Sequence, residues 1–170
     1  DKFLALHLSG GTTDVLLMDG DALTPLGTSM DLHAGQLVDR AGVAMGLPFP
    51  SGPHLEKLAV QGRAQALVPV SMDEKNLQCH LSGAEAQLLR MVKDGHAHED
   101  IAAEVYSILC RTVLRLLKAA ADQTGTHHIL LAGGVASSRL FRELVQERNE
   151  KRRLHLKLHF GMPEYSGDNA

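Results

Sequence analysis

The sequence predicts a mixed-sheet α/β domain, and three observations support this fold class. Three apolar runs of strand length open the chain with short turns between them, which is typical of an antiparallel meander. Near the other end, an apolar run, a glycine turn, a helical segment and a second apolar run follow one another, as in the β-α-β unit of a parallel sheet. The 170 residues, 44% hydrophobic and 22% charged, suffice for one globular domain with a buried core.

The predicted meander has strands at residues 3–8, 14–18 and 22–28. Asp19-Gly20 is a typical hairpin turn, because glycine readily adopts the positive φ that such turns need. The turn at residues 9–13, Ser-Gly-Gly-Thr-Thr, is less usual. Its glycines let the backbone approach another group, and its N–H and hydroxyl groups can cradle an anion such as phosphate. A glycine-rich turn without a ligand is the alternative.

The middle of the chain is predicted to be mainly helical. A helix at 31–45 has apolar residues at helical spacing and Asp31 as its candidate N-cap. The run Gly-Leu-Pro-Phe-Pro-Ser-Gly-Pro at 46–53 ends it, and Pro53 starts the next helix. We expect further elements in this order: a helix at 53–60, an irregular segment around Pro69, a short strand at 77–81 and a helix at 83–92.

The helix predicted at 99–122 has the clearest pattern. Its apolar residues form one stripe along the helix, and Gly125 follows it as a C-terminal signal. A strand at 128–132, a helix at 138–150 and a strand at 154–160 complete the predicted domain.

A second glycine turn, Gly133-Gly134, lies between the strand at 128–132 and the helix after it. Ligands of α/β sheets bind at the carboxyl ends of strands and near helix N-termini, so this is a candidate binding position. A tight turn without a ligand is again the alternative. Two such turns, one in the opening hairpin and one at a later strand end, are combined in the nucleotide-gripping lobes of actin-like ATPases.

Charge and composition narrow the function classes. The net charge of −3 gives no overall positive field of the kind that nucleic-acid binders carry, although Arg148 and the run at 151–153 make a local basic patch typical of a solvated helix end. The two cysteines, Cys79 and Cys110, lie in or beside apolar runs, which favours reduced thiols in a cytoplasmic protein. No signal peptide or membrane-spanning run is visible.

The ten histidines invite a metal hypothesis. His155 and His159 have the spacing of a zinc-protease pair, but they fall in an alternating strand pattern and would share its solvent face with Lys157. No glutamate follows His155, so a His-Glu-x-x-His site is not predicted.

Four blocks of the sequence occur in the order of a known family. They are residues 6–13, residues 31–40 running into 46–53, residues 131–136, and Gly167-Asp168-Asn169-Ala170. Together they span nearly the whole chain, which resembles the C-terminal part of the glycoprotease-like family. These are TsaD-type proteins that transfer a threonylcarbamoyl group to tRNA, once described as O-sialoglycoprotein endopeptidases. The abrupt start and end of the sequence fit this resemblance, and we expect residues 1–170 to be a single actin-like (ribonuclease H-like) lobe of a two-lobed protein.

The resemblance implies a nucleotide site, a metal and partners. It implies ATP or an acyl-adenylate as ligand, its phosphate at the Ser-Gly-Gly loop and its ribose or adenine near Asp39 and Gly52. It also implies one divalent metal, iron or zinc, bound by Asp168 and by histidines of the other lobe, so that this lobe alone would be inactive. tRNA, small accessory proteins of the pathway and a dimer of paralogues are the implied partners. The implied nucleotide- or substrate-binding residues are Ser9, Gly10, Gly11, Thr12, Asp39, Gly52, Gly133, Gly134 and Ser138. No catalytic residue is assigned.

Several residues depart from the family pattern, and these keep alternatives open. Thr12 replaces a histidine, Ser138 replaces an asparagine, and the segment at 31–36 lacks two carboxylates. A lysine is also missing, since Ala84-Glu85 follow Ser82-Gly83. The sequence therefore predicts either an active transferase or a non-catalytic paralogue that acts as a binding partner or scaffold. A metal-dependent endopeptidase, the older description of the family, is a third hypothesis.

Overall fold

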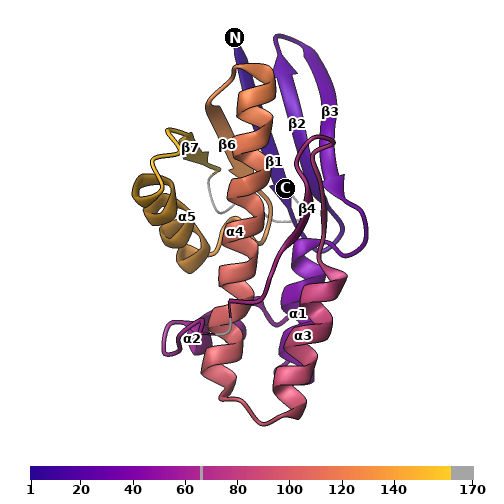
Figure 1. The fold of residues 1–170 in the computed structure, drawn as a ribbon, viewed down its shortest axis with the longest axis vertical. Helices are drawn as coiled ribbons and strands as arrows, with labels where there is room; N and C mark the ends of the chain where they lie inside the picture. Colours follow the sequence, from indigo (N-terminus) through magenta and orange to yellow (C-terminus); the bar gives the residue numbers. More distant parts are fainter. Residues whose placement is uncertain (66, 162–170) are drawn as a thin grey trace.

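The computed structural model describes residues 1–65 and 67–161. These residues form one seven-stranded mixed sheet, ordered β4-β5-β3-β2-β1-β6-β7, with helices packed against it and beyond its lower end (Figure 1). The predicted mixed α/β class and the opening meander are confirmed. The strands are β1 (Lys2–Leu8), β2 (Thr13–Asp19), β3 (Ala22–Ser29), β4 (Ser71–Asp73), β5 (Gln78–His80), β6 (His128–Ala132) and β7 (Lys157–Phe160).

The direction of the strands changes at β1. The meander β1-β2-β3 is antiparallel, whereas β6 lies parallel to β1 and β7 parallel to β6. Parallel neighbours end at the same edge of a sheet, so the glycine turns that follow β1 and β6 lie next to each other. The amide of Val135, after β6, donates to the carbonyl of Leu8, the last residue of β1, at 3.2 Å.

Five helices are described: α1 (Ala34–Ala44), α2 (Gly52–Ala59), α3 (Ser82–Lys93), α4 (His98–Thr124) and α5 (Arg139–Lys151). All five were predicted, with ends that differ by a few residues at most. The 27-residue α4 passes in front of the sheet and continues beyond it to α1, α2 and α3 (Figure 1). It ends at Gly125, whose φ of 73° is left-handed, as the sequence predicted.

The core lies between one face of the sheet and α4. Leu4, Leu6 and Leu8 alternate along β1 and are almost completely buried. Cys79 and Cys110 are buried as well, and burial raises the pKa of each thiol to about 11.

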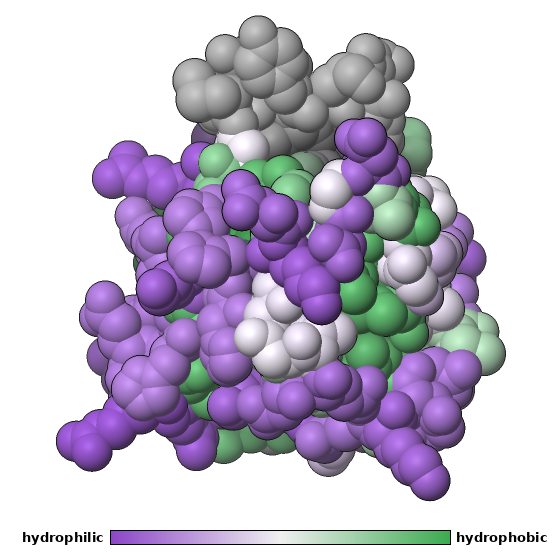
Figure 2. Space-filling model, turned by 90° about the horizontal axis from the view of Figure 1, so that it is seen from above, coloured by the Kyte–Doolittle hydropathy of each residue, from purple (hydrophilic) through white to green (hydrophobic). Residues whose placement is uncertain are grey.

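Viewed from the end where β2 and β3 are joined, most of the described surface is hydrophilic, with smaller hydrophobic groups between (Figure 2). Across the described residues, no helix is long and apolar enough to cross a bilayer.

A buried ion pair fixes the segment before β4 to α4. Glu104 is completely buried, its Oε2 lies 3.5 Å from Nη2 of Arg111, and its Oε1 accepts from the amide of Val68 at 3.3 Å. Arg111 donates to the carbonyl of Val68 at 2.8 Å. The strand β4 that follows was not predicted, because Ser-Met-Asp is too short and too polar to show a strand pattern.

The prediction that Asp31 caps α1 is wrong. The N-cap of α1 is His33, whose amide donates to the side chain of Gln36 at 2.9 Å. Asp31 instead accepts hydrogen bonds from the amide of Leu81 at 2.7 Å and the hydroxyl of Ser82 at 2.6 Å, at the start of α3. The carboxylate of Asp31 thus accepts hydrogen bonds at the start of α3, about 50 residues later in the chain. Local sequence does not encode such a pairing.

The predicted strand at 154–160 is also too long. Asn149 of α5 binds both the amide and the carbonyl of Leu156, at 3.2 and 2.8 Å, and so holds a loop at 154–156. His155 has a left-handed φ of 59° and lies outside β7, so the prediction that it shares a strand face with His159 is wrong. His159 instead stacks on His128, with Nε2 and Nδ1 3.3 Å apart.

We predict that Asp31→Asn destabilises the fold in a pH-dependent way. Partial burial raises the pKa of Asp31, but bonds from Ser82, Leu81 and Leu32 outweigh it, and the net pKa is lowered. A lowered folded-state pKa stabilises the protein above the unfolded pKa of about 3.9, and this contribution is lost as the pH falls through the folded value. Denaturant titrations should show a loss of about 1 kcal/mol at neutral pH that shrinks below about pH 4. The exposed Asp21→Asn is the control, and equal losses at all pH values would contradict the prediction.

We also predict that Gly35→Ala is strongly destabilising and Gly83→Ala is not. A Cβ on Gly35 in α1 would lie 2.5 Å from the amide nitrogen of Gly10 and 2.6 Å from the carbonyl carbon of Ser9, whereas a Cβ on Gly83 in α3 meets nothing within 4 Å. Thermal unfolding should show that Gly35→Ala lowers the free energy of unfolding by about 1–3 kcal/mol, as overpacking does. Gly83→Ala should not lower it, because alanine has the higher helix propensity. Equal melting temperatures for the two variants would show that the contact is not tight.

Candidate functional site

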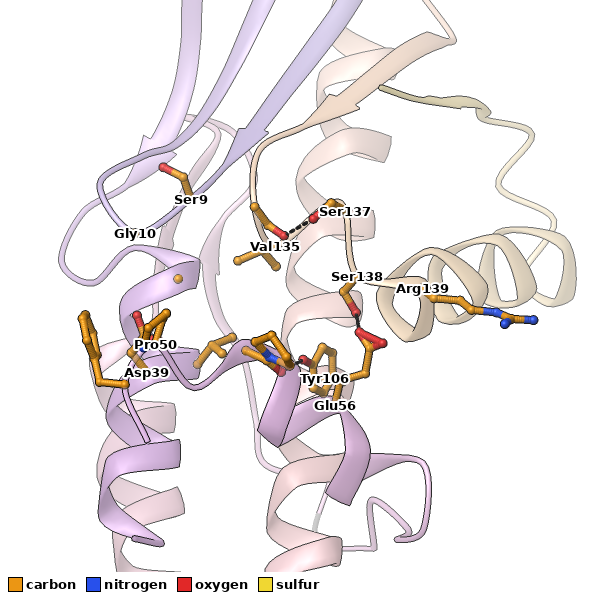
Figure 3. A pocket seen from close by; sticks show the side chains of 16 residues that line it. Ser9, Gly10, Asp39, Pro50, Glu56, Tyr106, Val135, Ser137, Ser138 and Arg139 are labelled. Atoms are coloured by element: carbon orange, nitrogen blue, oxygen red, sulfur yellow. Dashed lines mark hydrogen bonds between the residues drawn. The ribbon is translucent and has the colours of Figure 1, made fainter. Parts of the chain in front are cut away.

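A cavity of about 640 Å³ opens where the ends of β1 and β6 meet α1, α2, α4 and α5 (Figure 3). Most of the predicted binding residues lie around it, although they come from distant parts of the sequence. Those that line the cavity are Ser9, Gly10, Asp39, Gly52, Gly134 and Ser138. The others are placed differently: Gly11, Thr12 and Gly133 are not among the lining residues, and Asp168 lies outside the described residues.

The turn after β1 presents backbone to the cavity. The Ser9 amide donates to the carbonyl of Thr12 at 2.8 Å, and the Ser9 hydroxyl accepts from the amide of Gly11 at 3.2 Å, which fixes the turn. Gly10, between them, is exposed, and a Cβ there would meet nothing within 4 Å. Its amide donates to no other described residue, so it is free to bind an anion.

The two glycines of the turn after β6 have different roles: Gly133 allows close packing, and Gly134 lines the cavity. Gly133 has φ 101°, and a Cβ there would lie 2.2 Å from the carbonyl oxygen of Leu8, so only glycine allows the two turns to come this close. Gly134 faces the cavity instead and is exposed. The hydroxyl of Ser137 donates to its carbonyl at 2.6 Å (Figure 3). The start of α5 follows, with Ser138 as an N-cap that accepts from the amide of Phe141 at 3.2 Å.

Asp39 lies on α1 with its carboxylate held from one side. The amide of Ser51 donates to Oδ1 of Asp39 at 2.8 Å, and the Ser51 hydroxyl donates to the carbonyl of Pro48 at 2.9 Å. These bonds fold the Gly-Leu-Pro-Phe-Pro-Ser-Gly-Pro run against α1 and bring Gly52 to the cavity. Oδ2 of Asp39 stays available as an acceptor, because the hydrogen bond from the Ser51 amide uses Oδ1.

The sequence reasoning missed four polar residues of the cavity lining: Glu56, Tyr106, Ser137 and Arg139. The carboxylate of Glu56 accepts from the hydroxyl of Ser138, and the Tyr106 hydroxyl donates to the carbonyl of Gly52 at 3.4 Å. Burial, and secondarily the charge of Glu56, raises the pKa of Tyr106. Glu56 was detectable, since it follows Gly52 by four residues and therefore lies on the same helix face. Nothing in the sequence marked Tyr106 as a cavity residue, because a tyrosine among the apolar residues of α4 fits the pattern of a core position.

The cavity has two chemically different ends (Figure 3). Ser9, Gly10 and Ser137 lie at the sheet edge, where the unpaired amide of Gly10 favours an anion. Asp39, Glu56 and Tyr106 lie farther from the sheet, where carboxylates can accept hydrogen bonds from hydroxyl groups. Arg139 points away from the cavity and pairs with Glu143 at 3.0 Å.

The metal prediction rests on Asp168, which the structure does not describe. Within residues 1–65 and 67–161, no three histidine, cysteine, aspartate or glutamate side chains gather closely enough to hold a metal ion. A role for Asp168 in binding a metal therefore stays a prediction.

Comparisons with known proteins agree on one family. The family model of TsaD, tRNA N6-adenosine threonylcarbamoyltransferase, matches residues 2–170. A Methanopyrus kandleri protein of that description is 31% identical over the whole chain, which covers 48% of that relative. A probable bifunctional tRNA threonylcarbamoyladenosine biosynthesis protein of Thermoplasma acidophilum is 32% identical over 97% of the chain and 30% of its own length. The chain thus spans about a third to a half of the curated relatives it matches.

Solved structures support the fold alone. The crystal structure of full-length HypF in its phosphate- and nucleotide-bound form superposes with a TM-score of 0.79 at 11% sequence identity. The match covers 99% of this chain and 38% of the HypF chain. HypF of T. kodakarensis matches 99% of the chain with a TM-score of 0.76 at 14% identity. Because the family model matches from the second residue to the last, the chain belongs to the TsaD family of tRNA N6-adenosine threonylcarbamoyltransferases.

Proposed function

We propose that the cavity binds the adenylate part of an activated threonylcarbamoyl donor, so that this chain is the nucleotide-binding lobe of a tRNA threonylcarbamoyltransferase. One observation carries the proposal. A single cavity is lined by residues of the β1 turn, of α1 and α2, and of the β6 turn, three blocks that are separate in the sequence. Its volume, about 640 Å³, lies within the range of small-molecule sites.

The two ends of the cavity orient the ligand. The phosphate lies against the amides of Gly10 and Gly134, where no side chain intervenes. The ribose lies toward Asp39 and Glu56, whose carboxylates accept hydrogen bonds from its diol. The phosphate- and nucleotide-bound state named for HypF supports a nucleotide on this fold, although the identity of 11% carries nothing at residue level.

In the proposed reaction, the exocyclic amine of an adenosine in tRNA attacks the carbamoyl carbon of the acyl-adenylate. A C–N bond forms, the C–O bond to the phosphate breaks, the amine loses a proton and AMP leaves. The described residues hold the leaving phosphate and fix the donor, so their contribution is orientation and stabilisation of developing charge on the phosphate oxygens. ATP is the nucleotide from which such a donor is made, and tRNA is the acceptor because the family is named for it.

A non-catalytic scaffold is the second candidate function, and the departure at Ser138 favours it. Ser138 carries the shorter side chain, and its hydroxyl is already bound to Glu56 and to the amide of Phe141. Thr12 lies outside the cavity lining, so its substitution leaves the described cavity unchanged. The two candidates differ in one measurable property, which is whether the full-length protein restores threonylcarbamoyladenosine in a strain that lacks it.

We predict that Asp39→Asn weakens nucleotide binding by about tenfold to a hundredfold in the full-length protein. Asparagine keeps an oxygen for the Ser51 amide, so the fold is retained, but it removes a charged acceptor for the ribose, worth about 1.5–3 kcal/mol. Calorimetric titration with ATP and with AMP measures the change.

Asp94→Asn, at the exposed C-cap of α3, is the matched control and should bind as the wild type does. If wild-type protein binds neither ATP nor AMP, the proposal of a nucleotide site fails. If it binds them but does not restore threonylcarbamoyladenosine in the deficient strain, the scaffold candidate replaces the transferase.

A further inference from the structure

A second cavity, of about 660 Å³, lies on the outer side of α4, between the C-terminal part of α5 and the segment at 69–74. We call it the α4–α5 groove. Five of its lining residues are basic: Arg111, Arg115, Lys118, Arg148 and Arg152. Glu74 is its one acidic lining residue among those described. It shares no described lining residue with the nucleotide cavity.

Helical spacing explains how the basic residues gather. On α4, Arg111, Arg115 and Lys118 follow one another by four and three residues and so form one stripe. On the neighbouring α5, Arg148 and the C-cap Arg152 are four residues apart. Packing of α4 against α5 brings the two basic stripes into the lining of one groove.

Ion pairs within the described residues neutralise only part of this charge. Glu104, Glu74 and Asp122 pair with Arg111, Arg115 and Lys118 at 3.5, 2.5 and 3.0 Å. Arg148 and Arg152 take part in no ion pair of the described residues, which leaves about two positive charges uncompensated.

Arg111 and Arg148 lie close enough to repel each other. Burial lowers the pKa of Arg111, Glu104 opposes this, and the charge of Arg148 lowers it further. An anion that lies between two neighbouring guanidinium groups reduces this repulsion.

We infer that the α4–α5 groove binds the phosphodiester backbone of RNA. Its lining includes no aromatic side chain, so it offers charge for phosphates but no stacking surface for bases. The chain as a whole is acidic, with a net charge of −3, so the groove is a local exception and not part of a general positive field. The inference rests on the proposed function, in which the acceptor is tRNA, and it assigns that acceptor a contact surface apart from the nucleotide cavity.

The test uses the full-length protein and a fluorescein-labelled, unmodified tRNA transcript, with binding followed by anisotropy at several salt concentrations. The variant is Arg148→Gln/Arg152→Gln. Loss of two phosphate contacts lowers the salt slope by about 1.4 and the affinity at 0.1 M salt by roughly tenfold to thirtyfold. Arg90→Gln/Lys93→Gln, at the exposed end of α3, removes the same charge elsewhere and should change neither quantity.

The remaining arms separate the outcomes. The exposed Arg152→Glu is a second variant for the case in which the double variant unfolds, and it should also weaken tRNA binding. Equal losses in the groove and control variants, or none in the groove variants, overturn the inference. Polyglutamate that displaces tRNA at equal charge concentration overturns it in favour of an acidic protein partner. ATP titration of the same samples reports on the nucleotide cavity independently, so failure of the groove and failure of the proposed function are distinguishable.

Discussion

The close contact between the ends of β1 and β6 determines the rest of the site. The amide of Val135 donates a hydrogen bond to the carbonyl of Leu8. The two turns can approach this closely only because Gly133 has no side chain to clash with the β1 backbone. The contact follows from the parallel pairing of β1 with β6, in which Leu4 lies opposite Ile129, 125 residues later in the chain. It brings two anion-accepting turns to one edge of the sheet, where neither alone could surround a ligand.

The helices then complete the cavity around this edge. The amide of Gly35 donates to the carbonyl of Ser9 at 2.9 Å, and the amide of Ala34 donates to the hydroxyl of Thr13 at 2.8 Å. The first turn of α1 is therefore tied directly to the β1–β2 turn, which fixes where Asp39 stands. Because α4 is buried along most of its length, it gives α2 and α5 a rigid support on which Glu56 and Ser138 can meet.

The sequence was sufficient for the elements and for most of the cavity, and the reasons are local. The stripe of α4, the apolar run of β1 and the glycine turns are encoded within a few residues, so they were predicted. Asp31 was misassigned because its partners, Leu81 and Ser82, are contributed by a distant helix. The loop at 154–156 was read as strand because an alternating pattern cannot reveal that Asn149 already occupies the backbone groups of Leu156. Tyr106 was missed since a buried tyrosine in an apolar stripe resembles any other core residue.

One helix connects the two proposed binding surfaces, and its length sets their separation. The N-cap of α5, Ser138, lies at the nucleotide cavity, and its C-cap, Arg152, lies at the α4–α5 groove. A rise of 1.5 Å per residue puts these caps about 20 Å apart. An RNA held in the groove would therefore have to span about 20 Å to reach the cavity. The groove would then contact the tRNA at a distance from the reacting adenosine, which makes its role one of positioning and leaves the chemistry to the cavity.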